Sequence, residues 1–284
     1  MSSETFINRS LFMISWCLYI NKVLCFQHSW SIAMSFLISW GTGLFLDTSI
    51  CSHDALMDLL QIEAAPGFIA DDVSTDIQPA HWKLLVSWMY ETCSHLKANP
   101  SVFPMAVLLL SKRLDLAYVD KESYQKQAAT AIFIASKVHD YHHVRAQHIT
   151  RCCGSYFSSQ ELLNEELNFL HMLNYRLLIP SPCEFLGCFL SVLLPTIQNC
   201  WQNLVEDFTH IIARVFSQRL FLRRRPSLIS AAALLVALKN IHTSPTDLEF
   251  IENKLSALIR VSVLDLIKET QTITYLPPLE KIDG

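Results

Sequence analysis

Glycine is scarce in this 284-residue chain, which contains only six, at positions 41, 43, 67, 154, 187 and 284. Nucleotide-binding loops need closely spaced glycines, because only glycine lets the backbone approach a phosphate closely. Neither G-x-G-x-x-G nor G-x-x-x-x-G-K-[ST] can be written with these six, and the kinase signatures H-R-D and D-F-G are missing. No nucleophile–base pair is legible either. We therefore expect no catalytic residue, no cofactor and no enzymatic activity.

Metal-ligand spacing and a basic surface are also lacking. The nine cysteines form no C-x-x-C pair, which argues against a zinc site or a disulfide framework. Four histidines gather at positions 139, 142, 143 and 148, but without regular spacing and with only Asp140 as an acidic neighbour, so we expect a solvated loop and no metal. The net charge of −4 gives no general attraction to nucleic acid.

Residues 1–50 differ from the rest of the chain. They contain a ten-residue apolar run, Leu11–Ile20, and an uncharged run of eighteen residues, Ser29–Leu46. The second run meets the lower limit for spanning a bilayer, although its serine, glycine and threonine residues weaken it. A membrane anchor, a helix packed on the globular part and an extension without a native role all remain open. We expect membrane contact only if residues 29–46 insert.

One helical phrase occurs twice, 102 residues apart. Ala129–Lys137 aligns with Ala231–Lys239: alanine falls at the same three places, large apolar residues fill the gaps, and lysine closes both. A helix that is small and apolar all round must be packed on every side by other helices. The repeat therefore predicts two helical bundles, each built around one central buried helix.

Helix signals recur from residue 51 onward, and no strand pattern is present. Ser158-Ser-Gln-Glu161 is a capping box, and the helix it opens carries leucines 163, 167, 170 and 173 on one expected buried face. Ser227 is expected to cap the second central helix. The expected helices are 54–60, 82–95, 102–114, 124–138, 144–152 and 158–173, then, after a proline-marked linker, 184–194, 203–221, 227–239, 247–258 and 263–270. The predicted fold is all-α, with a short N-terminal helix followed by two five-helix sets.

Several phrases, in this order, resemble the cyclin family, in particular the D-type cyclins and those carried by some herpesviruses. They are Trp82–Met89, Val102–Ala106, Ala129–Lys137, Glu161–Leu167 with Leu173-Asn-Tyr175, Pro182–Leu186 and Arg225–Ile229. The resemblance covers about residues 52–272. It implies two stacked five-helix cyclin-box repeats, which agrees with the helix count. The domains expected are an apolar extension (1–50), the first box with its preceding helix (51–179), the second repeat (180–272) and a short tail (273–284).

The resemblance also implies a function. Cyclins bind and activate a cyclin-dependent protein kinase, and a D-type match implies a heterodimer with a kinase of the G1/S transition that acts on retinoblastoma-type substrates. The chain would then be a regulatory subunit, found in nucleus and cytoplasm. Two other classes remain open, a transcription-class cyclin and a helical scaffold without a kinase partner.

Candidate site residues follow from the same resemblance. Lys137, at the end of the first central helix, and Glu166, on the fifth helix, match the lysine and glutamate with which cyclins contact the kinase. A cation at a helix C-terminus also faces a favourable dipole, so we expect both charges at the rim of one surface. The apolar candidates for this face are Phe133, Ile134 and Phe169. A substrate-docking patch on the first helix would comprise His81, Leu84, Leu85 and Trp88.

Two departures from the family pattern concern one buried contact. Cyclins pair an arginine before the first helix with the aspartate of an L-D-R-F-L phrase, and these positions hold Trp82 and Ser111 here. Loss of one partner alone would leave a buried charge without its counter-charge, whereas loss of both together leaves none. The double replacement is therefore compatible with a folded first repeat. The L-x-C-x-E phrase for direct retinoblastoma docking is missing, and so is any Thr-Pro dipeptide.

Overall fold

The structure is a computed structural model that describes residues 53–65, 77–140, 143–177, 179–193, 201–241 and 244–279. Both apolar runs of the N-terminal extension lie outside these ranges. Every regular element within them is helical, so the predicted all-α fold is confirmed.

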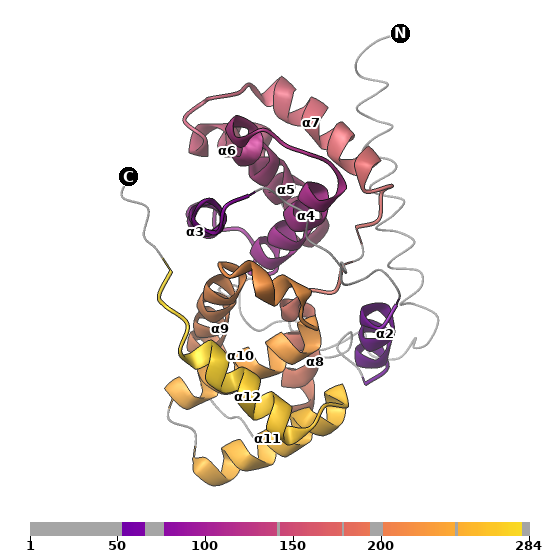
Figure 1. Ribbon diagram of the computed structural model, residues 1–284, viewed down its shortest axis with the longest axis vertical. Coiled ribbons are helices and arrows are strands. Elements are labelled where there is room, and N and C mark those ends of the chain that lie inside the picture. Colours follow the sequence, from indigo (N-terminus) through magenta and orange to yellow (C-terminus); the bar gives the residue numbers. More distant parts are fainter. Residues whose placement is uncertain are drawn as a thin grey trace, which may run out of the picture. The chain divides into compact units, whose positions relative to one another are not determined.

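Eleven α-helices follow one another along the described ranges (Figure 1). The predicted order, a short helix, five helices, a linker and five more, is confirmed. Several bounds differ by a few residues, and the largest difference is in the helix expected over 203–221, which ends at Phe216 and is followed by a 3-10 turn, Arg219–Arg223. The helices are α2 (His53–Glu63), α3 (Pro79–His95), α4 (Val102–Leu116), α5 (Tyr124–His139), α6 (Ala146–Cys152), α7 (Ser159–Met172), α8 (Pro182–Leu193), α9 (Trp201–Phe216), α10 (Pro226–Asn240), α11 (Pro245–Ile259) and α12 (Val263–Thr274).

The two repeated phrases form the central helices α5 and α10. Helix α5 packs against α3, α4, α6 and α7, and α10 packs against α8, α9, α11 and α12. Every residue from Gln127 to Ser136 in α5 and from Ile229 to Leu238 in α10 is buried. The alanines make this enclosure possible, because small side chains let neighbouring helices approach closely from all sides. The predicted division at residues 179 and 180 falls between α7 and α8, and its boundaries stay a prediction.

Helix α7 begins with the predicted capping box. The Ser158 N–H donates to Glu161 Oε2 over 2.7 Å, and the Glu161 N–H donates to Ser158 Oγ over 3.2 Å. The buried face of α7, however, is rotated from the predicted leucine face: Leu163 and Leu167 are only half-buried. The buried positions are Leu162, Glu166, Phe169, Leu170 and Leu173. The predicted face is thus right at Leu170 and Leu173 and wrong at Leu163 and Leu167, because Glu166, expected at the rim of a surface, turns toward α5 and pairs with Lys137.

Trp82 joins the two repeats at the contact between α3 and α9. Its side chain is fully buried, and its indole Nε1–H donates to the carbonyl oxygen of Phe216 over 2.8 Å. The Arg219 guanidinium lies 5.3 Å from the centre of the Trp82 ring and pairs with Asp115 over 3.1 Å. Ser111 is buried as well. An indole with a satisfied N–H therefore stands where the family has a buried cation, and no charge is stranded.

Replacement of Trp82 by phenylalanine is expected to lower the free energy of unfolding by about 1–3 kcal/mol, because the buried Phe216 carbonyl loses its donor. Urea unfolding of the two proteins measures the difference. Trp88→Phe on the same helix is the matched control, since Trp88 is half-buried and has no recorded hydrogen bond in the described structure. Equal losses for both substitutions would mean that ring size, and not the hydrogen bond, decides the effect.

Helix α2 precedes the first repeat in sequence but contacts the second, where it lies beside α8 (Figure 1). Its last residue, Glu63, is 4% exposed and accepts hydrogen bonds from Arg225 Nε (2.9 Å), the Ser227 N–H (2.7 Å) and Ser227 Oγ (2.7 Å). Ser227 is consequently not the cap that the sequence predicted. The cap position is Arg225, Ser227 is the second helical residue, and the carboxylate of a distant helix satisfies the α10 N-terminus.

Candidate functional site

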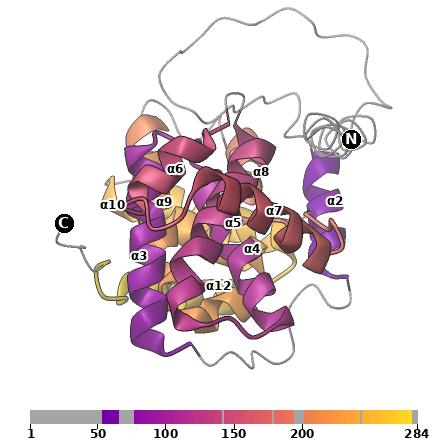
Figure 2. The same cartoon turned by 90° about the horizontal axis from the view of Figure 1, so that it is seen from above.

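Lys137 and Glu166 meet at the contact between α5 and α7 (Figure 2). Lys137 Nζ lies 2.6 Å from Glu166 Oε1 and 2.7 Å from Oε2, and the two side chains are 12% and 7% exposed. The expectation that both charges are held at one place agrees with this geometry. They are not free at a rim, however, because each neutralises the other.

Of the apolar candidates, Phe133 lies against this ion pair. Lys137 Nζ stands 4.0 Å from the centre of the Phe133 ring, a cation–π contact that further fixes the ammonium group. Phe133 and Ile134 are 3% and 2% exposed, and Phe169 exposes nothing. All three can therefore support a binding face only from inside.

A second polar cluster, which the sequence analysis missed, lies further along α5 and α7. Gln127 Nε2 donates to Glu165 Oε1 over 2.6 Å. Arg113, at the end of α4, is buried, and its Nε and Nη1 have no hydrogen-bond partner in the described structure. Burial lowers the pKa of Arg113, and the nearby Glu165 carboxylate opposes that shift. The sequence did contain a signal for this cluster: Arg113 stands where the L-D-R-F-L phrase of cyclins has phenylalanine.

The predicted docking patch forms one face of α3. His81 and Leu84 are exposed, and Leu85 and Trp88 are half-buried. These four positions follow helical spacing, so they share a side of the helix. The residues of α3 that face the core are different: Trp82, Val86, Met89 and Cys93. The patch is thus accessible, and its docking role stays a prediction.

Comparison with known proteins shows which family the chain resembles. Residues 56–178 match the family model "Cyclin, N-terminal domain". The chain is similar to the cyclin family over this segment. It is 28% identical to dog G1/S-specific cyclin-D1 over 170 residues, and 26% identical to the mouse protein over 199 residues. The matched segments cover 60% and 69% of this chain, and 57% and 67% of those relatives.

The fold has a solved counterpart as well. The chain superposes on the X-ray structure of a viral cyclin from herpesvirus saimiri with a TM-score of 0.68 and 23% sequence identity. The alignment covers 77% of this chain and 94% of the viral one. It establishes the cyclin fold.

Neither a metal cluster nor a membrane-spanning helix occurs in the part of the chain that the structure describes. His139 Nε2 lies 3.5 Å from Glu184 Oε1 across the junction between the repeats. His142 of the histidine cluster and residues 29–46 lie outside the described ranges. The basic segment Arg223–Ser227 ends in a serine that a kinase could phosphorylate only if it were exposed, and Ser227 is fully buried.

Proposed function

We propose that this chain is a cyclin, which binds and activates a cyclin-dependent serine/threonine kinase of the G1 class that phosphorylates retinoblastoma-type substrates. The observation that carries the proposal is the Lys137–Glu166 pair, held against the Phe133 ring at the contact between α5 and α7. Similarity to G1/S-specific cyclin-D1 supports the choice of kinase class. The chain acts as a regulatory subunit and partitions between nucleus and cytoplasm.

The ion pair keeps unused hydrogen-bonding capacity for a partner. Lys137 Nζ donates to both oxygens of Glu166, and an ammonium group has a third N–H. Each carboxylate oxygen likewise accepts more than one hydrogen bond. A kinase backbone can therefore bond to both side chains while the pair stays intact. Such binding avoids the cost of separating two partly buried charges.

Activation then follows from differential affinity. A kinase forms its own Lys–Glu ion pair only when its mobile helix moves inward. A rigid surface that fits the inward state better than the outward state shifts the equilibrium toward the active kinase. Burial of α5 from Gln127 to Ser136 supplies that rigidity, because a fully enclosed helix cannot move without opening the core.

The α3 patch, His81, Leu84, Leu85 and Trp88, completes the proposal as a substrate-docking surface. Leu84 is 46% exposed and can contact a partner. Half-buried Leu85 and Trp88 extend the apolar area around it. Docking here would raise the local concentration of a substrate for the bound kinase.

Kinase activation is the decisive test. The full chain is mixed with purified cyclin-dependent kinases of the cell-cycle and transcriptional groups, with a retinoblastoma fragment as substrate. We expect activation of the G1 kinases alone, at least tenfold over the kinase by itself. Activation of only a transcriptional kinase would assign the chain to the transcription class. Failure to form a complex with any kinase would leave a helical scaffold and overturn the proposal.

A further inference from the structure

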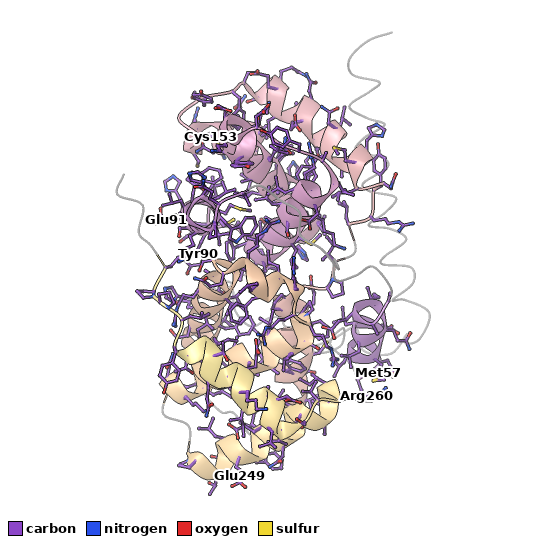
Figure 3. The ribbon with its side chains drawn as sticks, in the orientation of Figure 1. Met57, Tyr90, Glu91, Cys153, Glu249 and Arg260 are labelled. Atoms are coloured by element: carbon purple, nitrogen blue, oxygen red, sulfur yellow. The ribbon has the colours of Figure 1, made fainter. Side chains whose placement is uncertain are left out.

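A cleft of about 520 Å³ lies between α2 and the second repeat. Its apolar lining comes from Leu60, Ala64 and Ala65, on α2 and just after it, while Ile259 at the end of α11 borders the cleft but is fully buried. Its polar lining is Glu63, Arg225 and Arg260. Figure 3 shows Arg260 on the side of the second repeat that faces α2, with Met57 labelled close to it. The cleft is distant in sequence from both sites described above.

Of the two arginine side chains in this cleft, one has hydrogen-bond partners and the other has none in the described structure. Arg225 is already engaged, because its Nε bonds to Glu63 and its Nη2 donates to the Ile259 carbonyl oxygen over 3.1 Å. The Arg260 side chain is exposed and has no recorded hydrogen bond or ion pair within the described ranges. Two arginines against one carboxylate leave a positive charge there, on a chain whose net charge is −4. The cleft is thus a cationic spot with an apolar floor.

Arg260 also occupies an unfavourable backbone conformation. It follows α11 with φ of 54° and ψ of 50°, in the left-handed region. Glycine is the usual residue at this place after a helix, because a Cβ atom is strained there. A residue held in such a conformation is a reason to look for a function of its side chain. In Arg260 the strain and the unpartnered guanidinium coincide at the mouth of the cleft.

We propose that this cleft binds a peptide segment of a partner protein in which a carboxylate neighbours a large apolar side chain. The carboxylate pairs with Arg260, for which a planar guanidinium offers two parallel N–H donors. The apolar side chain rests on Leu60, Ala64 and Ala65, where the small alanines leave room. This docking site goes beyond the proposed kinase binding and does not depend on it.

The test uses the full chain and three fluorescein-labelled hexapeptides: GDLFDG, its basic counterpart GKLFKG and its polar counterpart GDSSDG. Fluorescence anisotropy should show that GDLFDG binds at least tenfold more tightly than either counterpart, and that this affinity falls as salt rises. Equal binding of all three peptides would overturn the proposal. So would displacement of GDLFDG by a single-stranded oligonucleotide, which would mean a general anion site.

Arg260→Gly separates binding from folding. This variant is expected to melt at a higher temperature than the parent, because glycine relieves the left-handed strain, and yet to bind GDLFDG about tenfold more weakly. Lys97→Gly is the matched control, since Lys97 is an exposed cation with φ of 50° after α3 in the other repeat. Ala64→Glu, which supplies an internal carboxylate to Arg260, should weaken binding as well. Unchanged binding by Arg260→Gly, or an equal loss in Lys97→Gly, would refute the assignment.

Discussion

Exchange of the two charges in Lys137→Glu combined with Glu166→Lys is expected to abolish kinase binding, with at least a hundredfold loss of affinity. The exchanged pair can still form, so the core beneath it keeps its packing and the helical circular-dichroism signal should not change. The exchange moves the hydrogen-bond donor from α5 to α7 and the acceptor from α7 to α5. Each backbone group on the kinase then faces a side chain of its own kind, an acceptor against the carboxylate and a donor against the ammonium group, so both are left unpaired at a desolvated interface, which costs several kcal/mol in total. Titration calorimetry with the purified kinase measures the loss.

The single substitutions give a different result. Lys137→Ala leaves the Glu166 carboxylate, 7% exposed, without its cation, and breaking such a pair costs about 3–5 kcal/mol of stability when fully buried. We expect a clear drop in the urea midpoint for either single substitution and a much smaller one for the exchange. Restored stability without restored binding would thus separate the interface role of the pair from its structural role.

The second repeat offers the matched control. Lys239, the counterpart of Lys137 in the repeated phrase, lies 3.5 Å from Glu252 and is 45% exposed. Exchange of Lys239 and Glu252 should leave kinase affinity within about twofold of the parent, since an exposed pair contributes little. If the Lys137–Glu166 exchange also leaves affinity unchanged, the assignment of the kinase-binding site is wrong.

Local signals explain why the fold was predictable. Alanine-rich phrases at 129–137 and 231–239 identified both central helices, because enclosure on all sides requires small and apolar residues throughout. The Ser158–Glu161 capping box located the start of α7, because both of its hydrogen bonds lie within three residues. Each of these features depends on neighbouring residues only, and such features can be read from a single sequence.

Contacts between distant residues were not predictable in the same way. Lys137 and Glu166 were both identified from the family resemblance, but their pairing across two helices was not, and both charges were expected to be available at the rim of one surface. The partner of Trp82 is a backbone carbonyl 134 residues away, and because every residue has such a carbonyl, the residue types do not indicate which one it is. Ser227 had the right type for a cap, yet Glu63 from α2 satisfies the helix start instead. Long-range partners compete with local ones, and the sequence shows only the local candidates.

The largest stability effect outside the kinase-binding face is expected at Glu63. Its buried carboxylate satisfies three donors, two on Ser227 and one on Arg225, and thereby fastens α2 to the start of α10. Glu63→Ala removes all three acceptors and leaves the Ser227 N–H and Oγ buried without partners. Each unsatisfied group costs about 1–3 kcal/mol, and Arg225 adds less because its side chain is 39% exposed.

We therefore expect Glu63→Ala to lower the free energy of unfolding by about 3 kcal/mol, and Glu63→Gln by less, since an amide oxygen still accepts one or two of these bonds. Hydrogen exchange should locate the effect: the amides of α2 lose protection first, because this helix has few other contacts to hold it, while α5 keeps its protection. Asp58→Ala, at an exposed position of the same helix, controls for the loss of a negative charge. Unchanged protection of α2 in Glu63→Ala would show that apolar packing of Leu56 and Leu60, and not the carboxylate, fastens the helix.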